Sequence, residues 1–489
     1  MQKIIILNKK TDWPFQIPDV EIVTALEYLT LPNWTNSRNV QVFNFCKNMG
    51  YQSNGYYVSL LAEARRHRVI PSVTTIQDIK TKSVVKVMST ELTDLIQTSL
   101  KRIKSDQFIL SVYFGHNLSK QYDKLARELY TLFKTPLLQA KFKFSDKWYL
   151  QSLSQLTLKD IPEQHLDFVQ DISEAYFRKE RYYYQKKDKL IFDLAILHNP
   201  LEKSSPSNAK ALQKFVSVAQ DEGFYTEMIT KDDYHRLAEF NALFIRETTA
   251  VNHHTYRFAR RASADGLVVI DDPVSILRCA NKVYLAEILT KAKVPSPKTM
   301  ILQQAKTEEI ITQLGLPVVL KQPDSAFSLG VKKAETKEEL ELFATTMLKE
   351  SELIIAQEYM PTDFDWRIGV LDGEVLYACK YFMALGHWQI YNWAVETEDF
   401  EGEFESVPVQ QIPEKIKDAA LKVTQLIGNG LYGVDIKMSG GNAYVVEVND
   451  NPNIDAGVED QILKDELYRR IIRTIKSRVE QTMNITHGS

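Results

Sequence analysis

Two stretches decide the fold, GVDIK at residues 433–437 and VVEVNDNP at residues 445–452, which read as the strands of a β-hairpin. Polar and apolar residues alternate in both, and side chains two positions apart in a strand lie on the same face. One face therefore carries Asp435 from the first strand, with Glu447 and Asn449 from the second. Two carboxylates and an amide oxygen are hard ligands, so we predict that these three residues bind Mg²⁺ beside a nucleotide.

The length of the hairpin connection decides whether the acidic residues can meet. Asp435 shares a face with Glu447 only if, for each pair of residues that face each other across the hairpin, the two residue numbers add up to an even value. A connection of odd length satisfies this condition, such as Ser439-Gly440-Gly441 or that run extended through Ala443, unless a β-bulge intervenes. The alternative is an ordinary hairpin whose exposed face happens to be acidic.

The composition is that of an ordinary globular protein, with 44% hydrophobic and 25% charged residues. A chain of 489 residues is too long to fold around a single hydrophobic core, which suggests several domains. The formal net charge of -3 predicts no nucleic-acid partner, and the lack of a long apolar run predicts no membrane association. The three cysteines lie far apart, which favours a reducing, cytoplasmic location. The sequence leaves open whether the protein forms a homo-oligomer.

Strand and helix patterns divide the chain into three parts. Residues 1–186 mix both patterns, so we expect an N-terminal α/β domain whose role the sequence does not settle. Residues 187–275 alternate between them, which indicates a small parallel, Rossmann-like sheet without the glycine fingerprint of a dinucleotide site. Residues 276–482 form a third domain that contains the hairpin. We detect no internal sequence repeat, and the fold class is α/β and α+β, multidomain.

A series of motifs resembles the ATP-grasp ligases, and in particular their RimK-like branch. In order, these are Lys282, VLK at residues 319–321, the loop at residues 325–330, QEY at residues 357–359, and DWR at residues 365–367, followed by the hairpin. An ordered set is much more specific than one motif. The resemblance implies a Rossmann-like pre-ATP-grasp domain and a two-lobed ATP-grasp domain. The first part resembles the N-terminal domain found fused to such ligases.

The resemblance also implies which residues bind ATP. Lysines at a strand end and near a helix start would contact the phosphates, and the backbone that follows an apolar strand would meet the adenine edge. The expected ATP-binding residues are Lys282, Lys321, Ser328, Gly330, Gln357, Glu358, Tyr359, Asp365 and Asn392. Solvated surface lysines, and a surface ion pair between Asp365 and Arg367, are the alternatives.

The implied activity is ATP-dependent ligation of a carboxylate to an amine through an acyl phosphate, with Mg²⁺ or in its place Mn²⁺. The substrates would be the carboxylate and the amine of amino acids or peptides. A cation should stabilise the tetrahedral intermediate, and the candidates in order are Arg246, Arg367 and Lys380. Arg246 is expected at the mouth that faces ATP. The alternatives are RimK-like modification of a protein C-terminus, an ATP-grasp phosphotransferase and a catalytically silent nucleotide-binding module.

Two departures from the family pattern concern the phosphate loop and the acceptor side. The loop at residues 324–330 has a single glycine where relatives are glycine-rich. The basic acceptor-side features of the ribosomal-protein-modifying relatives are replaced by an aromatic run at residues 379–393. We therefore expect a small amino acid or peptide as acceptor, with Asn392 as the best-matched polar residue.

Two adjacent histidines, His253 and His254, suggest a metal pair. Adjacent residues on a helix point apart, however, and the sequence shows no third ligand. A turn or a contact with substrate is the favoured interpretation.

Overall fold

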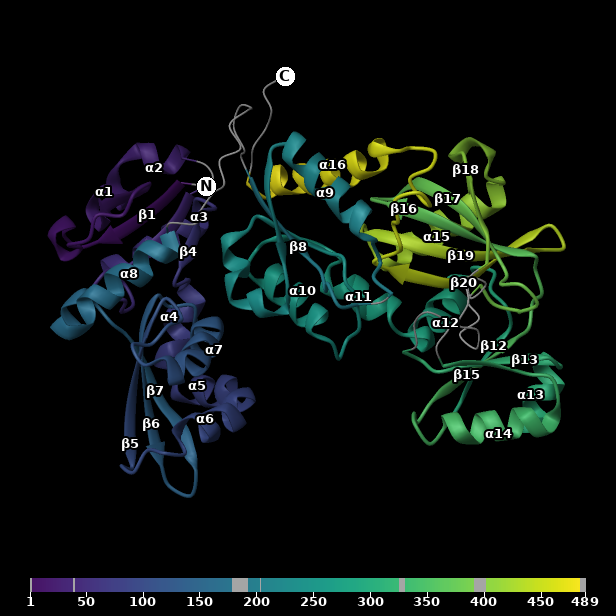
Figure 1. Cartoon of the computed structure of the whole chain (residues 1–489), viewed down its shortest axis with the longest axis horizontal. Helices are drawn as coiled ribbons and strands as arrows, with labels where there is room; N and C mark the ends of the chain where they lie inside the picture. The colour runs from purple at the N-terminus through teal and green to yellow at the C-terminus, as the bar shows by residue number, and fades with distance from the viewer. Residues whose placement is uncertain are drawn as a thin grey trace. The chain divides into compact units, whose positions relative to one another are not determined.

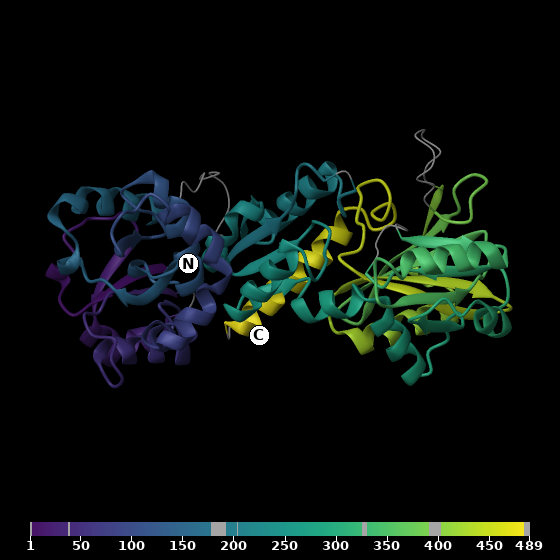
Figure 2. The same cartoon turned by 90° about the horizontal axis from the view of Figure 1, so that it is seen from below.

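The computed structural model describes residues 2–37, 40–177, 192–202, 204–324, 330–390 and 402–483. The chain divides into two compact units, one of residues 1–188 with 483–489 and the other of residues 189–482. Figures 1 and 2 show the elements of each unit in two views. No helix in the described ranges has the length and apolar character that crossing a membrane requires.

The first unit begins with a parallel sheet of four strands in the order β2-β1-β3-β4. These strands are β1 (Gln2–Leu7), β2 (Val20–Thr24), β3 (Val40–Asn44) and β4 (Arg68–Ile70). The helices that belong to this sheet are α1 (Ala25–Thr30), α2 (Pro32–Asn36), α3 (Asn54–Ala64) and α4 (Val73–Lys80). The apolar strands form the core, because Ile4, Ile6 and Val42 are fully buried.

A second sheet of three antiparallel strands completes the first unit in the order β5-β6-β7. Its strands are β5 (Gln107–Tyr113), β6 (Leu137–Phe144) and β7 (Trp148–Gln155). The remaining helices are α5 (Lys82–Met88), α6 (Thr93–Leu100), α7 (Asp123–Phe133) and α8 (Leu166–Phe177). Leucines of α7 pack against this sheet in one apolar core. The first unit is therefore α/β and α+β, as expected.

The second unit also begins with a parallel sheet of four strands, in the order β11-β10-β8-β9. The strands are β8 (Phe192–Leu197), β9 (Phe224–Ile229), β10 (Ala242–Ile245) and β11 (Val268–Ile270). Its helices are α9 (Ala209–Asp221), α10 (His254–Ala264) and α11 (Pro273–Cys279). This arrangement confirms the small parallel, Rossmann-like sheet that the sequence predicts.

The two parallel sheets repeat one another. Read from the other edge, the second sheet has the order β9-β8-β10-β11, in which the strands follow the same sequence order as in β2-β1-β3-β4. Helix α3 (Asn54–Ala64) corresponds to α10 (His254–Ala264), and β4 (Arg68–Ile70) to β11 (Val268–Ile270), each shifted by 200 residue numbers. Local hydrogen bonds repeat as well, since His67 N donates to Ala62 O at 2.8 Å and Leu267 N to Ala262 O at 2.9 Å.

The structure therefore contains a repeat of topology, although the sequence shows no internal repeat. The sequence hides the repeat because few positions are identical between the two copies, among them Tyr56 and Tyr256, Ala62 and Ala262, Ile70 and Ile270, and Lys82 and Lys282. Strand order and register depend on the apolar pattern rather than on residue identity. Shared topology therefore persists after sequence similarity has faded.

Two further sheets form the lobes that follow. The smaller lobe has the order β12-β15-β13-β14, and the larger lobe the order β18-β17-β16-β19-β20. The strands are β12 (Thr299–Leu302), β13 (Val318–Lys321), β14 (Val331–Ala334), β15 (Ile354–Glu358), β16 (Phe364–Leu371), β17 (Glu374–Phe382), β18 (Phe404–Val407), β19 (Leu431–Ser439) and β20 (Asn442–Asp450). Figure 1 shows α13 and α14 together on one side of the smaller sheet.

The helices of these lobes bury apolar faces against the sheets. They are α12 (Lys282–Lys291), α13 (Thr307–Leu314), α14 (Lys337–Met347) and α15 (Glu414–Ile427). A further helix, α16 (Asp465–Thr482), packs instead on α9 and β11 of the Rossmann-like sheet. Ile416, Ala420 and Val423 of α15 share a core with strands of the larger sheet. The last helix, α16, lies along α9, where the ring centroids of Phe215 and Tyr468 are 4.7 Å apart.

The hairpin of β19 and β20 closes with a two-residue turn rather than with a connection of odd length. Ser439 pairs with Asn442, and the intervening Gly440 and Gly441 have φ angles of +55° and +74°. Such left-handed backbone is the tight hairpin geometry that glycine favours. A register shift after Asp435 supplies the β-bulge that restores the pairing of Asp435 with Glu447.

Candidate active site

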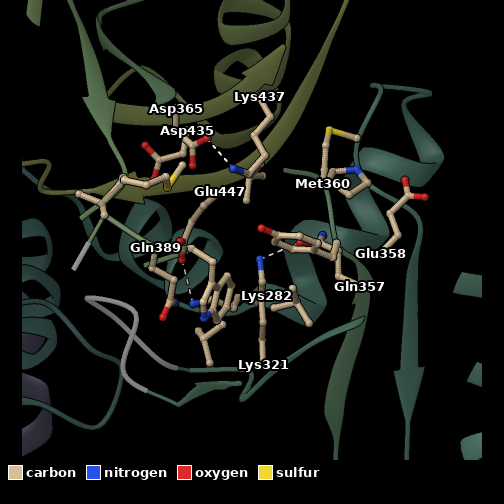
Figure 3. Close-up of a pocket in the computed structure, with 18 residues that line it drawn as sticks. Lys282, Lys321, Gln357, Glu358, Met360, Asp365, Gln389, Asp435, Lys437 and Glu447 are labelled. Atoms are coloured by element: carbon tan, nitrogen blue, oxygen red, sulfur yellow. Dashed lines mark hydrogen bonds and ion pairs between the residues drawn. The ribbon is translucent and has the colours of Figure 1, made fainter. Parts of the chain in front are cut away.

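Two pockets adjoin at the hairpin: the first lies between the two lobes, and the second between the larger lobe and loops of the Rossmann-like sheet. The first pocket is lined by Lys282, Pro297, Val319, Lys321, Val331, Gln357, Glu358, Tyr359, Met360, Asp365, Met383, Trp388, Gln389, Ile390, Asp435, Lys437, Val446 and Glu447 (Figure 3). The second pocket is lined by Arg367, the loop at residues 248–252 and residues 449–453, among others. Both pockets share Lys282, Asp435 and Glu447. Charged side chains thus stand where the two spaces meet.

The acidic face of the hairpin forms as the sequence predicts. Asp435 of β19 pairs directly with Glu447 of β20, and residues paired in this way lie side by side on one face of a sheet. The amide of Asn449 donates to Oδ2 of Asp435 at 3.1 Å. The convergence of these three oxygen-bearing side chains is therefore confirmed.

Three carboxylates of the site each contact a cation. Nζ of Lys282 lies 2.8 Å from Oε1 of Glu447, and Nζ of Lys437 lies 2.6 Å from Oδ1 of Asp365. Arg367 contacts Asp435 through two nitrogens, with Nη2 donating to Oδ2 at 3.0 Å. Asp365 and Arg367 do not pair with each other, so the expected alternative of a local ion pair is wrong.

These contacts set the protonation of the two hairpin carboxylates. Burial favours the neutral form of Glu447, but the positive charges of Lys282 and Lys321 outweigh burial and lower its pKa. Burial raises the pKa of Asp435, and the charge of Arg367 only partly offsets that effect. Glu447 is thus the more firmly ionised of the two.

Lys321 ends β13 and points its amine into the first pocket. Its Nζ donates to Oε1 of Gln357 at 2.7 Å, and the residue is 9% exposed. Burial lowers the pKa of Lys321 to about 8, although the carboxylate of Glu447 acts in the opposite direction. Lys282 begins α12 because Asn281 caps that helix, accepting from the backbone of Val283 at 3.0 Å. Both lysines therefore lie where the sequence predicts.

The end of β15 lines the first pocket next to aromatic rings. Glu358, Tyr359 and Met360 all reach the cavity, and the Tyr359 and Trp388 rings meet edge to face at 6.1 Å. The backbone N–H of Glu358 already donates to the carbonyl of Lys298 at 2.9 Å. The backbone that could meet an adenine edge therefore begins after that N–H, at Tyr359 and Met360.

Lys380 lies on the wrong side of the sheet for the role that the sequence suggests. It pairs with Trp366, which is buried in the core beneath the sheet, while Arg367 pairs with Cys379 on the opposite face. Nζ of Lys380 lies 2.9 Å from Glu405. The strand alternation that turns Arg367 toward the pocket turns Lys380 away from it. The expectation of a catalytic Lys380 is therefore contradicted.

Arg246 is fully buried and does not face the pockets. Its guanidinium donates to Ser207 Oγ at 3.0 Å, to Asn451 Oδ1 at 2.7 Å and to the carbonyl of Pro452 at 2.9 Å. These contacts fix the segment after β20 against the Rossmann-like sheet. The expectation that Arg246 stands at a mouth facing ATP is wrong, because the side chain turns inward to satisfy its buried donors.

Three other predicted residues complete the comparison. Gly330, at the start of β14, has a φ of +73° and accepts from Gln322 N at 3.0 Å. Ser328 and Asn392 lie outside the described residues. Sequence reasoning missed Lys437, Met360 and Gln389 as lining residues. The alternation of β19 offers a signal for Lys437, which is two positions from Asp435.

Two family models match the chain. Residues 25–172 match the RimK-like ATPgrasp N-terminal domain, and residues 279–475 match the RimK-like ATP-grasp domain. The two lobes that enclose a pocket lined by lysines and an acidic hairpin define an ATP-grasp enzyme, a carboxylate–amine ligase that uses ATP. Within that class, the chain belongs to the RimK-like ATP-grasp family.

Named relatives match part of the chain. The coenzyme gamma-F420-2:alpha-L-glutamate ligase of Methanococcus maripaludis is 28% identical over 206 residues, 40% of this chain and 68% of the relative. The alpha-aminoadipate–LysW ligase LysX of Saccharolobus solfataricus is 30% identical over 196 residues, 38% of this chain and 67% of the relative. A solved D-alanine–D-alanine ligase from Bacillus anthracis, complexed with ATP, has a TM-score of 0.48 at 17% identity and covers 60% of this chain and 100% of that chain.

Proposed function

We propose that this ligase joins the carboxylate of an amino acid or small peptide to the amine of a second one. The observation that carries the proposal is the meeting of two pockets at Lys282, Asp435 and Glu447. One pocket would hold ATP and the other the substrates, so that the transferred phosphoryl group stands at their junction.

ATP would lie in the first pocket with its adenine next to Tyr359, Met360 and Trp388. Apolar and aromatic side chains cover the faces of a flat base, and a few polar groups set its orientation. The amines of Lys282 and Lys321 would contact the phosphates as compact positive charges. Asp365 lines the same pocket from the larger lobe, where it pairs with Lys437, and it would contact the nucleotide from that side.

Asp435, Glu447 and Asn449 would hold Mg²⁺, with Mn²⁺ as a substitute. The donor set fits, because two carboxylates and the amide group of Asn449 lie together on one partly buried face of the hairpin. Bound there, the ion would neutralise charge on the β- and γ-phosphates. Arg367 would have to loosen its contact with Asp435 when the ion binds.

The reaction proceeds in two displacements. A carboxylate oxygen of the first substrate attacks the γ-phosphorus, the bond to the β-phosphate oxygen breaks, and an acyl phosphate and ADP result. The amine of the second substrate then attacks the acyl carbon, loses a proton and expels inorganic phosphate. Arg367 lines the second pocket, so its guanidinium would stabilise the oxyanion of the tetrahedral intermediate. Arg246 would position the surrounding segment instead.

The choice of substrates follows from the relatives and from the second pocket. Two relatives are named for glutamate and alpha-aminoadipate ligation, which supports an amino acid as one substrate. The second pocket carries polar side chains from Thr248, Thr249, Asn252, Asn451 and Asn453. Such groups can pair with the carboxylate and the amine of a second amino acid or peptide.

The test is a screen of amino-acid pairs for ATP-dependent release of phosphate, followed by the mass of the product. A product lighter by one water than the sum of two substrates supports ligation. A stable phosphorylated product would instead establish a phosphotransferase and overturn the proposal. Release of phosphate only when a folded protein is supplied would favour RimK-like modification of a protein C-terminus.

A further inference from the structure

One carboxylate and two imidazoles gather at the loop that enters the second pocket. Glu247 follows β10, and His253 and His254 stand at the start of α10. One ligand atom from each side chain lies within 4.8 Å of the others. The intervening residues 248–252 line the second pocket. The cluster therefore joins the two ends of this loop, with Glu247 before it and the two histidines after it.

The polar atoms of the cluster are poorly satisfied. Nε2 of His254 lies 2.7 Å from Oε1 of Glu247, which is an ion-pair distance. Within the described parts of the chain, however, neither oxygen of Glu247 nor Nε2 of His254 has a hydrogen-bond partner of acceptable geometry. Glu247 is only 1% exposed. A buried carboxylate without hydrogen bonds is costly, and a bound cation would satisfy it.

The repeated sheet of the first unit shows that the fold does not need this cluster. Phe45 N donates to Ile6 O at 2.9 Å and Arg246 N to Leu197 O at 2.8 Å, so these two residues occupy the same place. The next residues are Cys46 and Glu247, each 1% exposed. The same buried position thus holds a thiol in one copy and a carboxylate in the other.

The histidine positions differ in the same way. Ser53 and His253 are the N-caps of the corresponding helices α3 and α10, and Asn54 and His254 are their first residues. The first copy forms the same helix with neutral, non-imidazole side chains. The second copy therefore carries a carboxylate and two imidazoles for a reason other than folding.

The two imidazoles point together rather than apart. His253 caps the helix with extended backbone, at φ −98° and ψ 163°, so the angular separation of helical neighbours does not apply. The ring centroids are 3.9 Å apart. Nδ1 of His253 lies 3.0 Å from Oγ1 of Thr255, the type of outer contact that orients a metal-bound imidazole. The sequence-based objections to a metal pair, splayed rings and a missing third ligand, are both removed.

We propose that Glu247, His253 and His254 bind a divalent transition-metal ion of the zinc class. Two imidazoles and a carboxylate suit such ions, whereas Mg²⁺ prefers oxygen ligands. Tetrahedral zinc sites separate neighbouring ligand atoms by about 3.4 Å. The three ligand atoms lie within 4.8 Å of one another, so the wider spacings shorten on binding, while His254 Nε2 and Glu247 Oε1, now 2.7 Å apart, move slightly apart. Water takes the fourth position, and the ion holds the loop at residues 248–252 in place. The proposal is independent of the ligase substrates.

The experiment uses the full chain with the hairpin carboxylates removed by Asp435→Asn and Glu447→Gln. This background separates the proposed site from the site beside ATP. Zinc chloride is titrated by calorimetry in a buffer that does not chelate, and metal content is measured after desalting. We expect one zinc per chain. Adding Glu247→Gln or His254→Asn should weaken zinc binding by about 100-fold or more, because each removes a ligand.

A matched control removes a histidine elsewhere. His116 lies beside Asp123 in the first unit at 3.9 Å, and His116→Asn in the same background should leave zinc binding unchanged. Circular dichroism checks that each variant is folded. If Glu247→Gln does not fold, the visible spectrum of the hairpin variant with cobalt(II) decides, since tetrahedral ligation by nitrogen and oxygen gives intense bands. No bound zinc in the hairpin variant, equal zinc binding after Glu247→Gln, or no cobalt bands would each overturn the proposal and leave an ordinary ion pair.

Discussion

At the scale of single residues, charge neutralisation dominates the site. Asp365, Asp435 and Glu447 each contact a lysine or an arginine, and Glu447 is the one of the three whose pKa is lowered below its ordinary value. A triphosphate brings several negative charges, which compete for the same cations. Binding of ATP should therefore rearrange the ion pairs as well as fill the pocket.

Replacing Glu447 by glutamine tests the hairpin as a metal site. The substitution removes one negative charge and preserves the shape, so we expect a loss of about 100-fold or more in kcat/KM for amide formation with little change in Tm. Steady-state assays with Mg²⁺ measure the effect. Glu405→Gln is the matched control, because Glu405 pairs with Lys380 at 2.9 Å away from the pockets. Full activity in Glu447→Gln would remove the residue from the site.

Lys321 predicts a pH dependence of ATP binding. Its pKa of about 8 means that the amine is protonated below that pH and becomes neutral above it. Attraction to the phosphates is therefore present below about pH 8 and lost as the pH rises through that value, so KM for ATP should increase there. Lys321→Arg keeps its charge at every pH and should flatten the profile. An identical rise in both proteins would assign the effect to another group.

At the scale of elements, the alternation of side chains along a strand decides which residues face the pocket and which face the core, and sequence motifs alone do not show this. The pattern places Asp435 and Glu447 on the polar faces of their strands, since apolar Val434 and Val448 occupy the other face, but their pairing also requires a β-bulge. The β-bulge after Asp435 could not be predicted, because it depends on how two glycines close the turn. The motif suggests a catalytic role for Lys380, but motif spacing does not reveal which face of β17 is turned toward the core.

The two faces of the larger sheet give a paired prediction. Arg367→Ala should lower kcat/KM by about 100-fold, because the guanidinium lines the second pocket and contacts Asp435. Lys380→Ala should stay within about twofold of the parent, since distant surface changes rarely couple to a site. Steady-state kinetics of both variants measure this contrast. Comparable losses in the two variants would show that the face assignment does not govern activity.

At the scale of the whole molecule, one fold is used twice with different side chains. The matching strand orders and registers follow from apolar strands of similar length, which the sequence revealed in both places. Recognition of the repeat required the structure, because the charged residues around Arg246 and Glu247 correspond to Phe45 and Cys46. Arg246 could not be placed from its motif, since its partners at residues 206–207 and 451–452 come from distant parts of the chain.

A fragment of residues 192–483 tests whether the second unit is sufficient for nucleotide binding. The lining residues of both pockets run from Pro206 to Asn453, and this unit has its own apolar cores. We expect the fragment to bind ATP with a Kd within about twofold of the intact chain, measured by calorimetry. A Kd weaker by tenfold in a folded fragment would show that the first unit contributes to the site.

The most direct test is a crystal structure with a non-hydrolysable ATP analogue and Mg²⁺. The account predicts adenine beside Tyr359 and Met360, with phosphates on Lys282 and Lys321. It also predicts a metal ion about 2.0–2.1 Å from oxygens of Asp435 and Glu447. Adenine bound elsewhere, or a metal ion without a ligand from the hairpin, would contradict it.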